Sequence, residues 1–458
     1  MILLEGGESP SSFYFMKKQI QIDLSKKYCF PQIIEVEYKG KILAISPETA
    51  NWIVLDNENQ LKFFRLLQVN SIQEALSQAQ VLNNDSNWVI AQIEARKLDN
   101  YVVQNSILDI QSLHFYITNV CNLRCPHCYM RAGERFEEEL CTDEIKNVLS
   151  EFKQCGGEKV TFTGGEVATR KDFVEIVQYA ASVGLQSKIL SNGVLWRQDM
   201  VDDLSDMISS IQFSVDGYDE ESNQRIRGVN SFKATLKTID KFVAKGVQVD
   251  VAVTPFFDGD LVNHIQDYAL FAKSLTDKYD GEKFVIRFSH ELLDGREIEL
   301  TDEERAEYGK IIDKIYSAYY GTDVSYYPFI GRFKEHRILE NCMFGHLSIS
   351  ATGDIFLCSR IPSVASIGNV RAMSMDTIMK KAKTAQSLSN INNLRPCNTC
   401  ELKYICGGGC RIDYFPELTT CSDIEKLNPL SIPPRKCSMK EKEYYYDIMI
   451  RTNEMLFR

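Results

Sequence analysis

Between residues 112 and 320, short apolar runs alternate with amphipathic stretches. The apolar runs are rich in β-branched and aromatic residues, and they fall at 113–120, 159–164, 187–193, 210–217, 247–256 and 283–290. The stretches between them have helical spacing, as in 142–154, where Thr142 is suited to cap a helix. Six such repeats predict an α/β fold, with a parallel sheet that curls into a partial (β/α)6 barrel of the TIM type. The functional site of such a barrel lies at the C-terminal ends of its strands.

The first 104 residues follow a different pattern. Short β-like pieces come first and helical patterns follow them, at 32–40, 41–46, 51–56, 58–68, 71–80 and 89–98. A polar stretch at 81–87, VLNNDSN, is typical of a turn-rich excursion. This order of elements predicts a small α+β domain ahead of the barrel.

The rest of the chain is dense in cysteine and adds further segments. We expect domains at 1–104, 110–325 and 335–440, and a C-terminal helix at 441–458. Within the third domain, the polar stretch 383–396 is typical of a linker or a loose helix.

Composition and charge argue against several classes of protein. The 458 residues are 44% hydrophobic and 25% charged, as is ordinary for globular proteins, and the net charge is −11. The negative balance argues against a nucleic-acid partner. No apolar run reaches the roughly 18 residues that predict a membrane span. The acidic, Gly-rich start at 1–15 lacks the features of a signal peptide, so we expect a cytoplasmic protein.

Fourteen cysteines in such a chain favour metal ligands over disulfides. Three of them, Cys121, Cys125 and Cys128, stand in the run CNLRCPHC directly after the first predicted strand. Three thiolates can hold three irons of a [4Fe–4S] cube, which normally takes four cysteines, so one iron would stay open to a ligand. A zinc knuckle or unrelated surface thiols are the alternatives. Three other cysteines stand apart and are expected to be buried or idle: Cys29, Cys141 and Cys155.

The run CNLRCPHCY resembles the signature of the radical SAM enzymes. The resemblance implies that the open iron chelates the amino and carboxylate groups of S-adenosylmethionine (SAM). An electron from the cluster then cleaves SAM to a 5′-deoxyadenosyl radical, which abstracts hydrogen. Tyr129 is expected to contact SAM. His127 is not expected to be a cluster ligand, because the loop already supplies three.

Later motifs in the barrel resemble the SAM-binding elements of the same family, in the same order. They imply a SAM pocket made by Gly164, Gly165 and Glu166 (GGE), Ser191 and Asn192 (SNG), Ser214 (SVDG) and Arg227. The arginine is expected to pair with the SAM carboxylate, a geometry that suits its planar fork. Arg225 is the alternative for that role, and Asp216 is expected to be a turn residue rather than a base.

The cysteine-rich segment resembles the SPASM domain, which carries two auxiliary [4Fe–4S] clusters. Its pattern is Cys342, then Gly353 with Cys358, then C-x2-C-x5-C-x3-C, then a final cysteine. The resemblance implies a proximal cluster on Cys342, Cys358 and Cys410, and a distal cluster on Cys397, Cys400, Cys406 and Cys437. Cys421 either completes the proximal cluster or is idle, which would leave an open iron there. A zinc ribbon is the alternative, since eight cysteines would suit two Zn(Cys)4 sites.

The N-terminal pattern resembles the winged-helix peptide-recognition domain that precedes many peptide-modifying radical SAM enzymes. In that domain a leader peptide adds a strand to an exposed sheet edge. The alternative is a domain that only packs on the barrel.

Together the resemblances imply a maturase that oxidatively modifies a ribosomally made precursor peptide, forming a thioether or a carbon–carbon cross-link. A reductant such as flavodoxin or ferredoxin would supply electrons, and no assignable protein base is expected. An anaerobic sulfatase maturase is one rival, but that family typically has Asp where this chain has Ser359. A peptide epimerase or splicing enzyme and a non-enzymatic peptide-binding scaffold are the others. The peptide, the bond formed and the oligomeric state cannot be read from the sequence.

Overall fold

The computed structural model describes residues 22–79, 83–99, 110–279, 281, 283–322, 342 and 344–457. The start at 1–15 and the predicted junction between 325 and 335 lie outside the described residues.

Six parallel strands form the central sheet, as the alternation predicted. They are β4 (Ser112–Tyr116), β5 (Lys159–Thr163), β6 (Gln186–Ser191), β7 (Ile208–Ser214), β8 (Gln248–Val253) and β9 (Phe284–Phe288). Side chains alternate between the two faces of the sheet, and one face carries fully buried residues such as Phe115, Phe162 and Ile189. That apolar face packs under the helices, so the α/β fold with a parallel sheet is confirmed.

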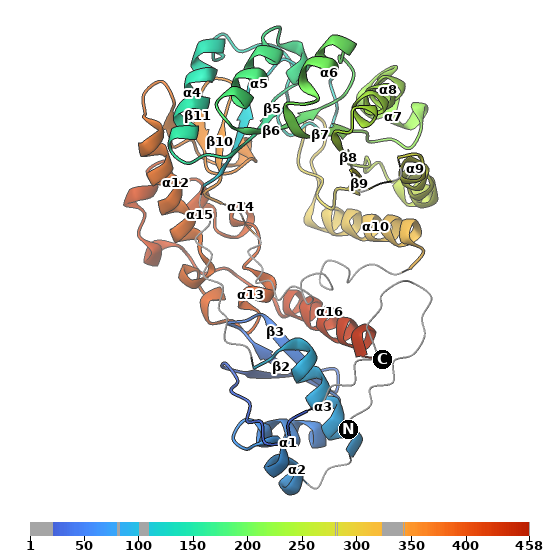
Figure 1. Ribbon diagram of the computed structural model, residues 1–458, viewed down its shortest axis with the longest axis vertical. Coiled ribbons are helices and arrows are strands. Elements are labelled where there is room, and N and C mark those ends of the chain that lie inside the picture. The colour runs from blue at the N-terminus through green and yellow to red at the C-terminus, as the bar shows by residue number, and fades with distance from the viewer. Residues whose placement is uncertain are drawn as a thin grey trace.

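Helices connect the strands and cover the outside of the sheet (Figure 1). They are α4 (Thr142–Gln154), α5 (Phe173–Ser182), α6 (Gln198–Leu204), α7 (Glu220–Arg227), α8 (Ser231–Ala244), α9 (Ile265–Lys278) and α10 (Asp302–Tyr320). Each connection returns the chain to the same end of the sheet, so all strand C-termini meet at one rim.

The sheet does not stop at the barrel. The strand β10 (Leu347–Ile349) pairs in parallel with β4, and β11 (Asp354–Phe356) and β12 (Gly368–Asn369) follow it antiparallel. The result is a nine-stranded sheet in which the cysteine-rich segment supplies one edge. The first auxiliary cysteines are therefore held by the same sheet that positions the barrel site.

The N-terminal unit is a three-stranded antiparallel sheet followed by three helices. Its elements are β1 (Ile34–Tyr38), β2 (Lys41–Ser46), β3 (Asn51–Leu55), α1 (Glu58–Leu67), α2 (Ile72–Ala79) and α3 (Asn83–Arg96). The prediction of a turn-rich excursion at 81–87 was wrong for residues 83–87, because α3 already begins at Asn83, and residues 81 and 82 lie outside the described part of the chain. Asp85 in its first turn accepts hydrogen bonds from the side chains of Asn57 (3.2 Å) and Gln60 (3.0 Å), and its charge suits a helix N-terminus.

The cysteine-rich segment contains short elements and two long helices. They are α12 (Met375–Ser389), α13 (Lys403–Cys406), α14 (Arg411–Tyr414), α15 (Pro416–Thr419) and α16 (Met439–Phe457). The polar stretch at 383–396 is not a linker in its first half, because Ala385 and Leu388 of α12 are buried in the main core.

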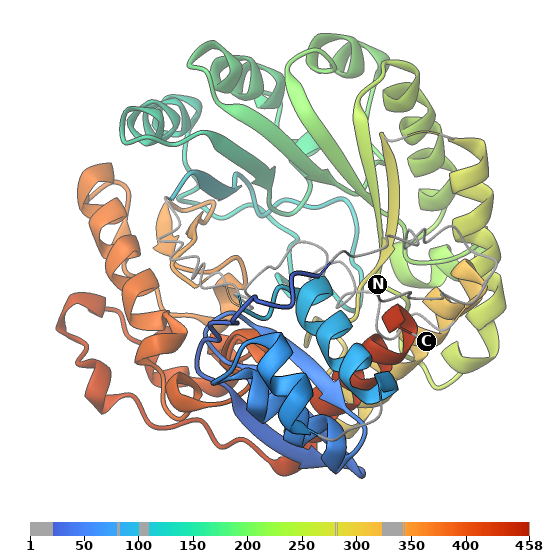
Figure 2. The same cartoon turned by 60° about the horizontal axis from the view of Figure 1, so that its bottom comes forward.

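In Figure 1 the barrel lies at the top and the N-terminal unit at the bottom, and the cysteine-rich segment runs from the sheet edge down to the N-terminal unit. In Figure 2 the N-terminal unit comes forward. One face of the N-terminal sheet packs on its own helices. The other face packs on α16 and on Leu402 and Ile405 beside the auxiliary cysteines. Within the described residues, no helix has the length and apolarity needed to cross a membrane.

Candidate active site

The three cysteines of the CNLRCPHC loop lie just beyond the C-terminal end of β4, at the rim where the strands end. The loop is pinned at its start, where the backbone N–H of Cys121 donates to the carbonyl of Gly133 (2.9 Å). Burial raises the pKa of the Cys121 thiol to about 11 and also raises that of Cys125. Thiols in such surroundings become thiolates when a positively charged centre binds them, so the donor set fits an iron–sulfur cluster.

The two glycines of the GGE motif are required by close backbone approach. A Cβ on Gly164 would lie 2.3 Å from the carbonyl oxygen of Thr118, and one on Gly165 would lie 2.2 Å from that of Val120. Both distances are far inside van der Waals contact. The approach lets the Gly165 and Glu166 amides donate to those two carbonyls, each at 2.8 Å. The motif thereby fixes the strand extension that leads into Cys121.

Glu166 ties the ends of β5 and β6 together. Its fully buried carboxylate accepts hydrogen bonds from the Ser191 hydroxyl (2.7 Å) and the Asn192 backbone N–H (2.7 Å). The Asn192 side chain then donates to Asn122 in the cysteine loop (2.8 Å). Burial raises the pKa of Glu166, which these hydrogen bonds oppose. The GGE, SNG and cysteine-loop motifs therefore form one connected network.

Asp216 is more than a turn residue, because its carboxylate joins three other polar groups. Its carboxylate is fully buried and contacts Arg227 Nε (2.5 Å) and His127 Nε2 (3.0 Å), and it accepts a hydrogen bond from the Thr254 N–H (2.8 Å). Burial acts to raise the pKa of Asp216, but Arg227 and His127 outweigh it and hold the pKa at about 2. The ion pair with Asp216 holds the Arg227 guanidinium, whose charge acts to lower the pKa of the Cys125 thiol against the raising effect of burial.

The other barrel residues that the sequence predicted to contact SAM have neighbours that differ from one residue to the next. Ser214 is the last residue of β7, at the strand-end rim. Arg225 is exposed, whereas Arg227 is paired with the buried Asp216. The Tyr129 hydroxyl hydrogen-bonds with that of Tyr116 (3.1 Å), which itself donates to the carbonyl of Ser359 (2.5 Å). Tyr129 thus faces the cysteine-rich segment.

The predicted proximal cysteines come together from three separate segments. Backbone amides point at two of their sulfurs: the Arg411 N–H at Cys342 Sγ (3.4 Å) and the Arg360 N–H at Cys358 Sγ (3.5 Å). The Arg360 side chain donates to Cys410 Sγ (3.5 Å), and a hydrogen bond from Cys410 lowers the pKa of Cys342. Sulfurs surrounded by donors are suited to cluster ligation.

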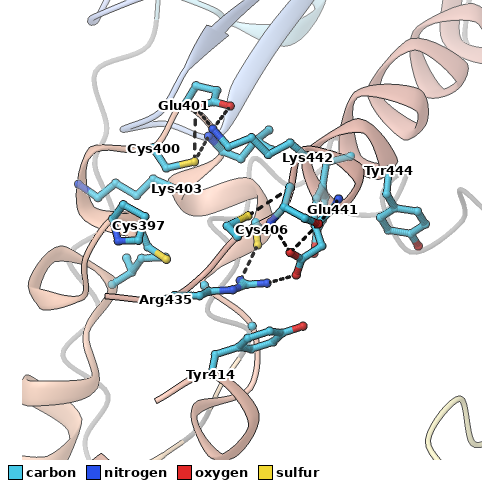
Figure 3. A pocket seen from close by; sticks show the side chains of 18 of the residues that line it. Cys397, Cys400, Glu401, Lys403, Cys406, Tyr414, Arg435, Glu441, Lys442 and Tyr444 are labelled. Atoms are coloured by element: carbon cyan, nitrogen blue, oxygen red, sulfur yellow. Dashed lines mark hydrogen bonds and ion pairs between the residues drawn. The ribbon is translucent and has the colours of Figure 1, made fainter. Parts of the chain in front are cut away.

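The predicted distal cysteines, Cys397, Cys400, Cys406 and Cys437, line one cavity of about 540 Å³ (Figure 3). Among the described residues, no three metal-ligating side chains are close enough to hold a single ion. Thiols arranged around a cavity of this volume suit a multi-iron group. Cys421 is not among the described residues that line this cavity.

A run of three glycines lies between the last two cysteines of the C-x2-C-x5-C-x3-C pattern. Gly407, Gly408 and Gly409 have φ values of 66°, 78° and 73°, a conformation that residues with a Cβ rarely adopt. The run lies between Cys406, which lines the cavity, and Cys410, which contacts Arg360.

Sequence reasoning missed several polar residues that organise these sites. Glu139 is buried and accepts hydrogen bonds from the Asn119 N–H (2.7 Å) and the Thr118 hydroxyl (3.0 Å), which secures the start of the cysteine loop. Arg360 and Arg435 each place a guanidinium nitrogen beside a cysteine sulfur. None of these residues stands in a motif, so only their contacts reveal them.

Two family models match this chain. Residues 115–272 match the radical SAM superfamily, and residues 341–401 match SPASM, an iron–sulfur cluster-binding domain. The first match covers the barrel strands β5 to β8 and the cysteine loop, and the second covers the auxiliary cysteines up to Cys400.

The chain is also similar to curated proteins and to solved structures. The chain is 32% identical to Fe-coproporphyrin III synthase of Methanosarcina barkeri over 35% of this chain and 41% of that protein, so it spans about two fifths of that relative. It is 23% identical to PqqA peptide cyclase of Bradyrhizobium diazoefficiens over 75% of this chain and 91% of that protein. In structure it is similar to SuiB of Streptococcus suis, with a TM-score of 0.51, 18% identity and coverage of 89% of this chain and 98% of that one.

The strand-end site, the two family models and the shared architecture lead to one conclusion: the chain has the radical SAM α/β fold followed by a C-terminal SPASM domain.

Proposed function

We propose that this protein is a radical SAM enzyme that oxidatively modifies a ribosomally made precursor peptide. The observation that carries the proposal is the network at the strand-end rim, in which Glu166 joins the SNG turn and Asn192 joins the cysteine loop. A peptide substrate is supported by the likeness to PqqA peptide cyclase, which covers 91% of that protein.

In this proposal the residues of the rim hold a [4Fe–4S] cluster and SAM. Cys121, Cys125 and Cys128 would bind three irons, and the bound cluster supplies the electron that cleaves SAM. Gly164 and Gly165 bring backbone close to the loop, and Glu166 orients the turn that carries Asn192. Arg227, held by Asp216, presents a fixed positive charge suited to the SAM carboxylate.

The two auxiliary sites fit clusters that accept the electron left on the substrate. Oxidative bond formation removes two hydrogens from the peptide, so one electron has to leave after the first hydrogen is abstracted. Cys342, Cys358 and Cys410 would hold the proximal cluster, and the four cysteines of the cavity would hold the distal one. A thioether or a carbon–carbon link is the expected product. A thioether is favoured if Cys421 is not a ligand, and a reductant such as flavodoxin or ferredoxin completes the system.

The N-terminal unit is proposed to hold the leader of the peptide by strand addition. Its sheet has two edges. At the β3 edge, the Gln92 side chain already bonds both backbone groups of Val54, at 2.9 Å and 2.8 Å, so a leader has to displace Gln92 there. At the other edge, β1 pairs only with β2 among the described strands.

A cleavage assay tests the core of the proposal. The protein, reconstituted anaerobically with iron and sulfide, is expected to convert SAM to 5′-deoxyadenosine and methionine when reduced with dithionite. Cys125→Ala should abolish this conversion and leave peptide affinity unchanged. Conversion that survives in this variant would overturn the assignment of the cysteine loop.

The substrate is tested by anaerobic co-expression with short peptides encoded beside the gene, followed by mass spectrometry. Loss of two hydrogens per modified site is the expected result, and fragmentation separates a thioether from a carbon–carbon link. An unchanged mass with no deuterium uptake in heavy water would argue against peptide modification.

Leader binding is tested at both edges of the N-terminal sheet. Glu37→Pro places a proline on the β1 edge, and Gln92→Ala frees the β3 edge. Reduced leader affinity in Glu37→Pro assigns β1, and increased affinity in Gln92→Ala assigns β3. If neither variant changes the affinity, the strand-addition proposal fails.

A further inference from the structure

The distal auxiliary cavity contains an arginine that points at a cluster cysteine. Arg435 Nη1 lies 3.7 Å from Cys406 Sγ, within hydrogen-bond range of sulfur (Figure 3). The Arg435 side chain is only 5% exposed. A buried cation at this position acts on the sulfur through little intervening water.

Two further contacts hold this guanidinium in place. Arg435 Nη2 pairs with Glu441 Oε1 at 2.6 Å, and the guanidinium carbon lies 3.6 Å from the centre of the Tyr414 ring. The second Glu441 oxygen is occupied by the Ser438 N–H (2.7 Å) at the start of α16. The cation therefore has little freedom to turn away from Cys406.

Glu441 also limits the electrostatic effect of Arg435 on the cavity. Its carboxylate offsets part of the positive charge that Arg435 presents to the cavity. A second pair, Lys442 with Glu401 at 2.8 Å, repeats this arrangement on another side of the cavity. The two pairs meet the sulfurs differently: Arg435 of the first pair donates to Cys406 Sγ, whereas Glu401 of the second pair accepts a hydrogen bond from Cys400 Sγ (3.4 Å).

Adding an electron to an iron–sulfur cluster adds one negative charge. A fixed cation that hydrogen-bonds a ligand sulfur stabilises the reduced form more than the oxidised form, and this raises the reduction potential. A neighbouring carboxylate has the opposite effect.

We propose that Arg435 raises the reduction potential of the distal auxiliary cluster through its hydrogen bond to Cys406, and that Glu441 moderates this effect. The inference rests on the proposed function, since it requires a cluster at this site. The cluster would gain and lose one electron, taken from the substrate radical by way of the proximal site and passed on to an external acceptor. Arg435 is a positioning residue, since it acts through Cys406.

An anaerobic redox titration followed by electron paramagnetic resonance tests the proposal on the reconstituted full chain. The distal signal is identified as the one lost in Cys400→Ala. In Arg435→Gln, the ratio of reduced to oxidised distal cluster at a given solution potential should fall about tenfold, a shift of about 59 mV. In Glu441→Gln the ratio should rise, by about threefold, because the cation is less neutralised.

Arg360→Gln is the matched control, because Arg360 contacts Cys410 of the proximal site instead. It should leave the distal potential unchanged. Arg435→Lys keeps the charge and should recover part of the shift. Iron content per chain is measured for every variant.

Equal distal potentials in the wild type and in Arg435→Gln, at equal iron content, would overturn the inference. So would shifts of the same sign in Arg435→Gln and Glu441→Gln, since a purely structural role predicts that pattern. Absence of any signal that depends on Cys400 would instead refute the distal cluster, and with it that part of the proposed function.

Discussion

The rim of the barrel and the distal auxiliary cavity are both built from cysteines, but the polar groups around them differ. At the rim, buried carboxylates organise the loop: Glu139, Glu166 and Asp216 accept hydrogen bonds from backbone and side chains. At the distal cavity, the organising groups include cations, with Arg435 beside a sulfur and Lys442 nearby.

Under the proposed function, the difference follows from what each site would bind. A site for SAM must fix several turns relative to one another, and strand ends in a parallel sheet provide that rigidity. A site that only holds a cluster and passes electrons can be built on short loops with left-handed glycines. Its cations then adjust the potential of the cluster rather than the position of a substrate.

The largest effect is expected from adding a side chain at the rim. In Gly165→Val, the new Cβ would lie 2.2 Å from the Val120 carbonyl oxygen, so the GGE strand has to move away from the cysteine loop. We expect SAM cleavage to fall at least about 100-fold, because small displacements of a reacting geometry have effects of that size. Chromatography of 5′-deoxyadenosine measures it. Gly309→Ala, at a helical position with open space, is the control, and equal activity of the two variants would contradict the role of the GGE motif.

The second prediction compares the effects on SAM binding of Arg225 and Arg227, which are two positions apart in the sequence. Arg227→Gln removes the charge that Asp216 holds beside Cys125, and we expect the Kd for SAM to rise about 30-fold, the value of a charged hydrogen bond of about 2 kcal/mol. Arg225→Gln, at an exposed position, should change the Kd less than twofold. Calorimetry on the reconstituted protein measures both. A larger change in Arg225→Gln would reverse the assignment.

A substitution in the buried core tests whether the distal site depends on the packing of the N-terminal unit for its stability. Ile45 is fully buried and belongs to the same apolar cluster as Leu402 and Ile405. We expect Ile45→Ala to lower the free energy of unfolding by about 3 kcal/mol and to reduce the iron retained at the distal site. Val285→Ala, at an exposed position on β9, should cost less than about 0.5 kcal/mol. Denaturant unfolding and iron analysis report the outcome, and unchanged iron content would show that the two parts are independent.

The smallest effect concerns the ion pair between the same two parts. Glu48 and Lys403 lie 3.0 Å apart, with Glu48 41% exposed. Because partly exposed pairs are screened by water, Glu48→Gln should lower the free energy of unfolding by less than about 1 kcal/mol. A loss comparable to that of Ile45→Ala would mean that charge, rather than apolar packing, holds the N-terminal unit in place.

Much of the fold was predictable because its signals are local. The alternation of apolar runs and helical spacing reflects the physical periods of strands and helices, so the order of six strands could be read directly. The turn prediction failed over residues 83–87, where α3 begins and where Asp85 of its first turn is held by Asn57 and Gln60, more than twenty positions away. The extension of the sheet by β10 to β12 was missed for the same reason, since pairing with β4 joins residues that are far apart in the chain.

By itself, the sequence determined which chemistry the protein can hold, because cysteine spacing and glycine positions depend only on neighbours along the chain. Tertiary structure decided which polar groups act on those cysteines. Asp216 meets His127 and Arg227, and Arg435 meets Cys406, through contacts between separate elements. A hydrogen bond or ion pair between distant segments leaves no periodic trace in a single sequence, so it becomes visible only once the chain has folded.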